Sequence, residues 1–137
     1  MKIKLDAGAI LPMRAHPTDA GLDLYARETK TVPAFDCAFF DTGVHIELPE
    51  NTAGFIKSKS GLYCKHKIIS DGTIDVGYTG SIGVNLFNLG DRDYTVHAGD
   101  KISQLVIVPI LTPEIELVDE LKETARGNGG FGSTGYK

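Results

Sequence analysis

The segment IISDGTIDVGYTGSIGVNLFN, residues 68–88, alternates apolar residues with small or polar ones over most of its length. A period of two is typical of a strand with one face on a core. Asp71-Gly72 lies just before this alternation, and Asp-Gly pairs favour tight two-residue hairpin turns. We therefore predict a β-hairpin whose second strand carries Asp75 and Tyr78 on opposite faces. On this segment alone, Asp75 is best explained as a solvated strand residue.

The composition of the 137-residue chain fits one globular domain. Its 16 glycines and six prolines indicate many turns and a β-rich fold. A net charge of −4 argues against nucleic acid or a membrane surface as the partner. The only two cysteines, Cys37 and Cys64, are too few for a disulfide framework or a zinc site.

The N-terminal residues lack the apolar core of a signal peptide, and no apolar run is long enough to span a membrane. We expect a cytoplasmic protein, or one in the nucleus or another soluble compartment of the host cell if its source is eukaryotic or viral.

Turn signals at short intervals divide the chain into about nine short strands. This pattern is typical of a β-sandwich or jelly roll. His45 lies between the apolar residues Val44 and Ile46, so we predict a surface strand residue there rather than a catalyst. We also predict a short strand over residues 115–118 and a brief helix over residues 120–126.

The run KISQLVIVPIL, residues 101–111, is almost continuously apolar, as in strands that are buried on both faces. In an antiparallel fold, one of these faces is a candidate subunit interface. Gln104 is the only large polar side chain between the two ends of the run. A buried amide needs hydrogen-bond partners, so Gln104 is either a satisfied core residue or a ligand contact.

The segment KSKSGLYCKHK, residues 57–67, contains four lysines and one histidine. Ser60 is a candidate N-cap for a short helix that begins at Gly61. A helix N-terminus beside lysines is a candidate anion site. The alternative is a solvated basic loop.

The glycine-rich tail RGNGGFGSTGYK, residues 126–137, suits neither a helix nor a strand. It is either a disordered terminus or an arm that folds over a nucleotide. In the second case Phe131 would stack on the base and Arg126 would contact phosphate.

Five segments together resemble the motifs of the trimeric dUTP pyrophosphatase (dUTPase) family, in the order of that family. They are AGLDLYA at 20–26, SKSGL at 58–62, GTIDVGYTGSIGVNLFN at 72–88, GDKISQLVIVP at 99–109 and RGNGGFGSTG at 126–135. In two places the chain differs from the usual motif: Lys59 stands where the family usually has arginine, and Gly77 stands where it usually has aspartate.

The resemblance implies an all-β fold, a distorted jelly roll or β-clip barrel of short, mostly antiparallel strands with one short helix. Residues 1–125 would form this domain, and residues 126–137 a flexible C-terminal arm that closes over an active site. It also implies a homotrimer with its sites between subunits.

The same resemblance implies the roles of individual residues. Asp75 would activate the attacking water, Gln104 would help to hold it, and Asp23 would support Mg²⁺ through water. Tyr78 would pack under the deoxyribose and exclude a 2′-hydroxyl. The implied substrate contacts are Ser58, Lys59, Ser60, Gly61, Asp71, Gly72, Ile74, Tyr78, Gly83, Arg126, Phe131, Gly132, Ser133 and Thr134.

The implied function is hydrolysis of dUTP to dUMP and pyrophosphate by attack of water on the α-phosphorus, with Mg²⁺ as cofactor. This reaction would limit uracil in DNA and supply dUMP for dTMP synthesis. Three alternatives stay open: the related dCTP deaminase, a binding module in which dUTP switches a protein contact, and a structural jelly-roll protein without ligand chemistry.

Overall fold

The computed structural model describes residues 1–130, which form eleven strands and one short helix. The predicted all-β class and the single helix are confirmed. The elements are β1 (Lys2–Leu5), β2 (Gly21–Tyr25), β3 (Lys30–Val32), β4 (Cys37–Asp41), β5 (Val44–Glu47), β6 (Thr52–Lys57), α1 (Ser60–His66), β7 (Ile68–Ile69), β8 (Asp71–Ile74), β9 (Gly83–Asn88), β10 (Tyr94–Val96) and β11 (Lys101–Pro109).

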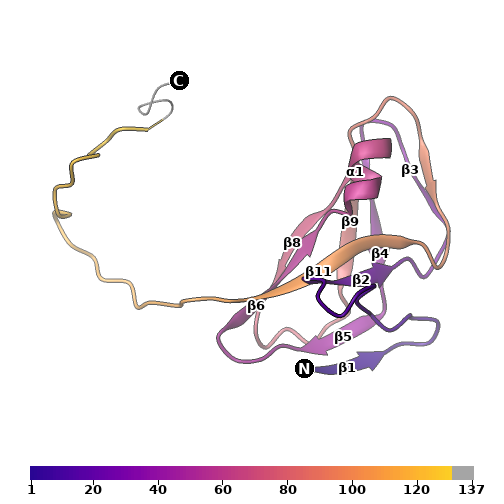
Figure 1. Cartoon of the computed structure of the whole chain (residues 1–137), viewed down its shortest axis with the longest axis horizontal. Helices are drawn as coiled ribbons and strands as arrows, with labels where there is room; N and C mark the ends of the chain where they lie inside the picture. The colour runs from indigo at the N-terminus through magenta and orange to yellow at the C-terminus, as the bar shows by residue number, and fades with distance from the viewer. Residues whose placement is uncertain (131–137) are drawn as a thin grey trace.

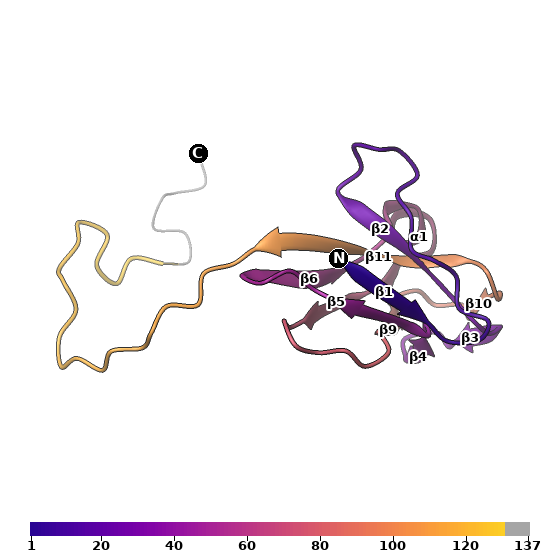
Figure 2. The same ribbon diagram turned by 90° about the horizontal axis from the view of Figure 1, so that it is seen from below.

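The described strands form four antiparallel sheets, and none of these sheets closes into a barrel. The largest has the order β2-β11-β6-β8, so the long strand β11 lies between β2 and β6. A second sheet has the order β4-β9-β7, and two small sheets pair β1 with β5 and β3 with β10. Figures 1 and 2 show these sheets gathered into one body.

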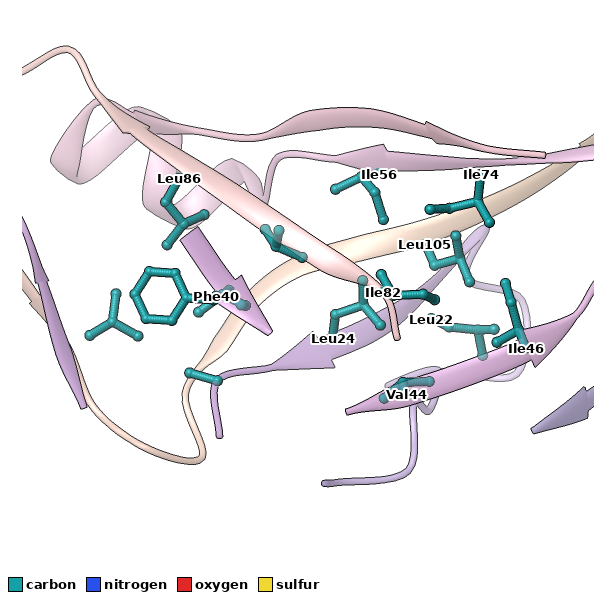
Figure 3. Packing of buried hydrophobic residues seen from close by; sticks show 14 of the residues in the cluster. Leu22, Leu24, Phe40, Val44, Ile46, Ile56, Ile74, Ile82, Leu86 and Leu105 are labelled. Carbon is teal, nitrogen blue, oxygen red and sulfur yellow. The ribbon is translucent and has the colours of Figure 1, made fainter. Parts of the chain in front are cut away.

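Apolar side chains from both larger sheets fill one core (Figure 3). Leu105 of β11 and Ile56 of β6 are 1% exposed, and Leu86 of β9 is fully buried. Burial of this kind contributes about 1.5–3 kcal/mol for each large aliphatic side chain. The alternation predicted for β5 and β9 is therefore confirmed where the strands have one face on this core.

The prediction of a hairpin turn at Asp71-Gly72 is wrong. Both residues lie within β8, where Asp71 pairs with Lys57 and Gly72 with Ile56 of β6. The preceding strand β7 pairs instead with β9, so the chain passes from one sheet to another at Ser70. Long-range pairing with β6 has overridden the local turn preference of Asp-Gly.

The predicted single strand after this point is interrupted by a loop at residues 75–82. The amide of Tyr78 donates to the carbonyl of Asp75 at 3.2 Å, and Gly77 has a φ of +91°. A positive φ at the third position is typical of a type II turn and suits glycine. Because Asp75 and Tyr78 flank this turn, the prediction that they lie on opposite faces of a strand is wrong.

Two further local predictions are wrong. Lys59 rather than Ser60 is the N-cap of α1, without a side-chain capping bond, and Ser60 is the first helical residue. The strand predicted at 115–118 and the helix predicted at 120–126 are also absent from the described chain. Residues 110–130 run away from the body as an extended segment (Figures 1 and 2). The amide of Ile110 donates to the carbonyl of Asn51 at 2.9 Å, but beyond it none of these residues pairs with a strand among the described residues.

The described residues include no helix long and apolar enough to cross a membrane.

Candidate active site

One carboxylate and two ammonium groups meet at one end of the β2-β11-β6-β8 sheet. Asp23 of β2 is 6% exposed. Its Oδ1 lies 2.5 Å from Nζ of Lys59, and its Oδ2 lies 2.7 Å from Nζ of Lys101. Lys59 stands at the start of α1, and Lys101 opens β11. The fold thus joins residues that are far apart in sequence into what we call the basic cluster.

The basic cluster keeps its carboxylate ionised. Burial by itself would raise the pKa of Asp23, but hydrogen bonds and charge from Lys101 and Lys59 outweigh it and hold the pKa below its usual value. The same hydrogen bond raises the pKa of Lys101. The two lysines carry one more charge than Asp23 neutralises, so the cluster can attract an anion.

Replacing Asp23 by asparagine is expected to lower the free energy of unfolding by about 1.5–3 kcal/mol near neutral pH, because it removes two charge-assisted hydrogen bonds. The folded pKa of Asp23 is lowered, so its contribution is present above its unfolded pKa of about 3.9 and is lost as the pH falls through the folded pKa. Urea unfolding of both chains at several acidic and neutral pH values measures this.

Asp91→Asn, at an exposed carboxylate, is the matched control. A stability difference for Asp23→Asn that stays the same at acidic and neutral pH would contradict the ion pairs.

Gln104 lies beside the basic cluster. It pairs with Asp23 of β2 on one side and with Lys57 of β6 on the other. Its Nε2 donates to the carbonyl of Ser58 at 3.2 Å. A side chain at Gly21 would overlap Oε1 of Gln104, so glycine is needed there. Gln104 is thus a half-buried amide within reach of a ligand bound at the cluster.

The second motif and β8 border the same end of the sheet. Ser60 and Gly61, in the first turn of α1, are exposed. The side chain of Ser58 donates to the carbonyl of Ser70 at 2.9 Å. Oδ1 of Asp71 forms an ion pair with Nζ of Lys57, at a distance of 2.6 Å. Ser58 and the residues around it are therefore held next to the first residues of β8.

Asp75 and Tyr78 lie elsewhere, in the loop between β8 and β9. Asp75 lines an open pocket of about 410 Å³ with residues from the start of β6 and from the chain just after β11, including Thr52 and Ile110. The hydroxyl of Tyr78 donates to the carbonyl of Ser81 at 3.0 Å, and its ring is 48% exposed.

One chain cannot bring Asp75 to Gln104. Asp71 and Gln104 both pair with Lys57, so they lie at the same level of the sheet. Asp75 follows Asp71 by four residues along β8 and beyond, which corresponds to about 13 Å. A water molecule within hydrogen-bond reach of one side chain is therefore out of reach of the other in the same chain.

The remaining predicted substrate contacts lie in three parts of the chain: at the ends of β8 and β9, on the extended segment, and after residue 130. Ile74 ends β8, where it is 9% exposed, and Gly83 opens β9 under the ring of Phe39. Arg126 lies on the extended segment, where its Nε donates to the carbonyl of Gly129 at 2.9 Å. The contacts predicted on the tail after residue 130 lie outside the described residues, namely Phe131, Gly132, Ser133 and Thr134.

Sequence reasoning missed Lys101 and two buried serines. Lys101 belongs to the fourth motif, and its place at the start of a strand beside an acid-bearing strand was the available signal. The hydroxyls of Ser70 and Ser103 lie 2.8 Å apart, and Ser103 also donates to the carbonyl of Lys57 at 2.9 Å. These serines join β6, β8 and β11 beneath the cluster.

The fold and the site define a class of protein: an all-β protein with a basic cluster at one end of its largest sheet. A sequence profile described as dUTPase matches residues 7–135. The chain belongs to the dUTPase family, as its five motifs predicted.

Two similar relatives are named deoxyuridine 5′-triphosphate nucleotidohydrolase. The protein from Gloeothece citriformis is 48% identical over 96% of this chain and 93% of its own length. The protein from Arabidopsis thaliana is 47% identical over 96% of this chain and 80% of its own length.

Solved structures of phage enzymes have the same fold. Staphylococcus bacteriophage 80alpha dUTPase with dUpNHpp matches with a TM-score of 0.88 at 34% identity, covering 98% of this chain and 97% of that one. The dUTPase of phage phi11 of S. aureus, described with a structural Mg(II) ion, matches with a TM-score of 0.82 at 31% identity, covering 89% and 98%.

Proposed function

We propose that this protein is a dUTP diphosphatase that hydrolyses dUTP to dUMP and pyrophosphate. The observation that carries the proposal is the basic cluster, in which Asp23, Lys59 and Lys101 come from the first, second and fourth motifs and meet beside Gln104. Membership of the dUTPase family supports it. Hydrolysis would limit uracil in DNA and supply dUMP for dTMP synthesis, and we expect it in the cytoplasm.

Each site would be completed by a neighbouring chain in a homotrimer. The basic cluster of one chain would bind the triphosphate, and the loop of a second chain would supply Asp75 and Tyr78. The separation of about 13 Å along the sheet supports this division, because a single chain cannot close the gap. The half-buried residues Val106, Ile107 and Val108 of β11 and the apolar residues after it are available for contacts between chains.

Attack on the α-phosphorus of dUTP requires a water molecule that is held in line with the pyrophosphate leaving group. Asp75 is exposed and would accept a proton from this water, a contribution of about 10²–10⁴-fold. The amide of Gln104 would orient the water. Lys59 and Lys101 would offset charge on the phosphates, and each would exchange part of its contact with Asp23 for the substrate.

Uracil would be read by the backbone of β8. This strand is the outer strand of its sheet, so half of its backbone N–H and C=O groups face away from β6. Uracil presents an acceptor, a donor and an acceptor in a row, which such an edge can complement. Cytosine would leave buried groups unpaired, and a mismatch of this kind can reduce the reaction by about 10⁴–10⁵-fold.

Mg²⁺ is the expected cofactor, and the chemistry of Asp23 fits it. Within one chain, the described residues contain no group of three or more side chains that could hold a metal ion together. Mg²⁺ is commonly held by one or two carboxylates and the phosphates of its substrate. The ionised Asp23 would hold the hydrated ion through water. When bound, Mg²⁺ would neutralise charge on the triphosphate.

The proposed activity is tested by measuring pyrophosphate release from each deoxynucleoside triphosphate and from UTP, with Mg²⁺ and with EDTA. We expect release from dUTP alone, at a rate that falls in EDTA. Release of ammonia from dCTP would instead support a deaminase, and no turnover of any nucleotide would contradict the proposal.

Replacing Tyr78 by alanine is expected to raise kcat/KM for UTP relative to dUTP, by about tenfold or more, because the ring would no longer exclude a 2′-hydroxyl. Competition assays with both nucleotides measure the ratio. Tyr63→Ala, at an exposed tyrosine of α1, is the matched control. An unchanged ratio in Tyr78→Ala would contradict this role.

Deleting residues 126–137 is expected to leave the oligomer intact and to lower kcat/KM for dUTP by at least about tenfold, because a closing arm excludes water and adds phosphate contacts. Sedimentation and pyrophosphate release measure the two properties. Full activity in the shortened chain would show that the tail is not a lid.

A second candidate function is a nucleotide-dependent switch of a protein contact. The 80alpha structure is described in a study stating that phage dUTPases control transfer of virulence genes by a proto-oncogenic G protein-like mechanism. The structural likeness to that enzyme favours this candidate here. A pull-down from the native host with and without a non-hydrolysable dUTP analogue tests it, and a set of bound proteins that does not change with the analogue would contradict it.

A further inference from the structure

The loop that carries Asp75 and Tyr78 is attached at its far end to the turn between β4 and β5. The carbonyl of Ile82 accepts from the backbone and the hydroxyl of Thr42 at 3.0 and 2.7 Å. The hydroxyl of Ser81 bonds to the carboxylate of Asp41. None of the five motifs includes this turn.

His45 of β5 is the next contact along the loop. Its Nδ1 lies 2.8 Å from the carbonyl of Thr79, the residue after Tyr78. Its Nε2 is buried and lies 3.2 Å from Oδ1 of Asp6, within ion-pair distance but outside hydrogen-bond geometry. The ring therefore joins the loop to the segment that follows β1.

Both ring nitrogens of His45 face groups that only accept. The hydrogen bond to the carbonyl of Thr79 needs a proton on Nδ1, and the carboxylate of Asp6 favours a second proton on Nε2. A neutral imidazole has a single N–H, so it can serve Thr79 or Asp6 but not both. The doubly protonated ring serves both groups at once, with a hydrogen bond to Thr79 and a positive charge beside Asp6.

We propose that the protonated His45 is a positioning residue for substrate binding, because it fixes Thr79 and thereby the loop that presents Tyr78 to the deoxyribose. This inference rests on the proposed function. Substrate affinity and selection against UTP then depend on a side chain outside all five motifs. As the pH rises and the ring loses the proton on Nε2, its charge pair with Asp6 is lost and only the hydrogen bond to Thr79 still holds it, so the loop is held less firmly.

The charges around the ring agree with this direction. The hydrogen bond to Thr79 and then the contact with Asp6 raise the pKa of His45, while burial and Lys4, its partner across β1 and β5, lower it. Asp41 lies on the loop side. Three more charged groups stand nearby: Arg27, which bridges Asp6 and Asp41, and Lys2 and Glu47, which pair with each other.

The raised pKa of His45 determines the direction in which its contacts change with pH. The charged ring is favoured in the folded chain, so the ion pair with Asp6 is fully present below the ordinary histidine pKa of about 6.5 and is lost as the pH rises through the higher folded pKa.

The test measures kcat and KM for dUTP and UTP from slightly acidic to alkaline pH. In the unaltered protein, KM for dUTP should rise by about two- to fivefold through the His45 transition, the equivalent of one partly exposed ion pair, while kcat changes less. His45→Gln should give a KM that is high and independent of this transition, with a lower preference for dUTP over UTP.

Two variants separate positioning from a general structural effect. Asp6→Asn should move the KM transition to lower pH, because it removes a charge that favours the protonated ring. His97→Gln, at an exposed histidine, should behave as the unaltered protein. Ionisation of the triphosphate affects all variants alike. A KM transition that His45→Gln retains, or that Asp6→Asn does not move, would overturn the inference.

A readout without turnover keeps this test independent of the proposed activity. The imidazole NMR signal that is lost in His45→Gln should titrate together with the amide signals of Tyr78 and Gly80. If dUTP is not hydrolysed at any pH, the proposed function fails while this titration still decides the contact. Loop signals that do not follow the ring would overturn it.

Discussion

Replacing Asp75 by asparagine is expected to lower kcat for dUTP by about 10²–10⁴-fold while the substrate still binds, because the amide keeps the shape of the side chain but cannot accept the proton of water. Asp75 is exposed in a loop, and its side chain makes no hydrogen bond or ion pair with the described residues, so the fold should not depend on it. Pyrophosphate release measures kcat, and calorimetry with a non-hydrolysable dUTP analogue measures binding.

Asp91→Asn, a second exposed aspartate in a turn, is the matched control and should retain the full rate. If Asp75→Asn released pyrophosphate as fast as the unaltered protein, another group would have to be the base.

Mixing two inactive variants is expected to restore activity. One chain carries Asp75→Asn and the other Gln104→Ala, and the two are unfolded and refolded together. If each site takes Gln104 from one chain and Asp75 from its neighbour, every mixed trimer contains one intact site. Random assembly in equal amounts should then give about a quarter of the unaltered activity.

The control mixes the two variants after each has folded alone, which should stay inactive as long as the subunits do not exchange. A second control refolds Gln104→Ala with a chain that carries both Gln104→Ala and Asp75→Asn. No chain in these mixed trimers has an intact Gln104, so they should stay inactive. Failure of the first pair to recover activity after co-refolding would contradict a site shared between chains.

Local sequence patterns correctly predicted the strands that have one face against the hydrophobic core and the other toward solvent. Residues alternate in β5 and β9 because one face of each strand meets apolar side chains. The same reasoning failed at Asp71-Gly72, because pairing with β6 decides the conformation there. It also failed after Leu111, where exposed apolar residues gave a strand pattern that has no partner strand among residues 1–130.

The site was predictable only in part. Asp23, Lys59 and Gln104 were named from the motif resemblance, since no spacing along the chain relates residues from three distant strands and loops. Lys101 was missed for the same reason, although it pairs directly with Asp23. His45 had the pattern of an ordinary strand residue, because its two partners come from loops on either side of β5.

The position of β11 has a consequence for how the protein is made. It is the last strand of the described chain, yet it lies between β2 and β6 and pairs with both. During synthesis on the ribosome, β2 and β6 therefore remain unpaired with β11 until the chain has been made past Pro109. Pairings between such distant residues form slowly. The unfinished chain thus exposes unpaired strand edges, and the growing protein depends on completion of its sequence before its largest sheet can assemble.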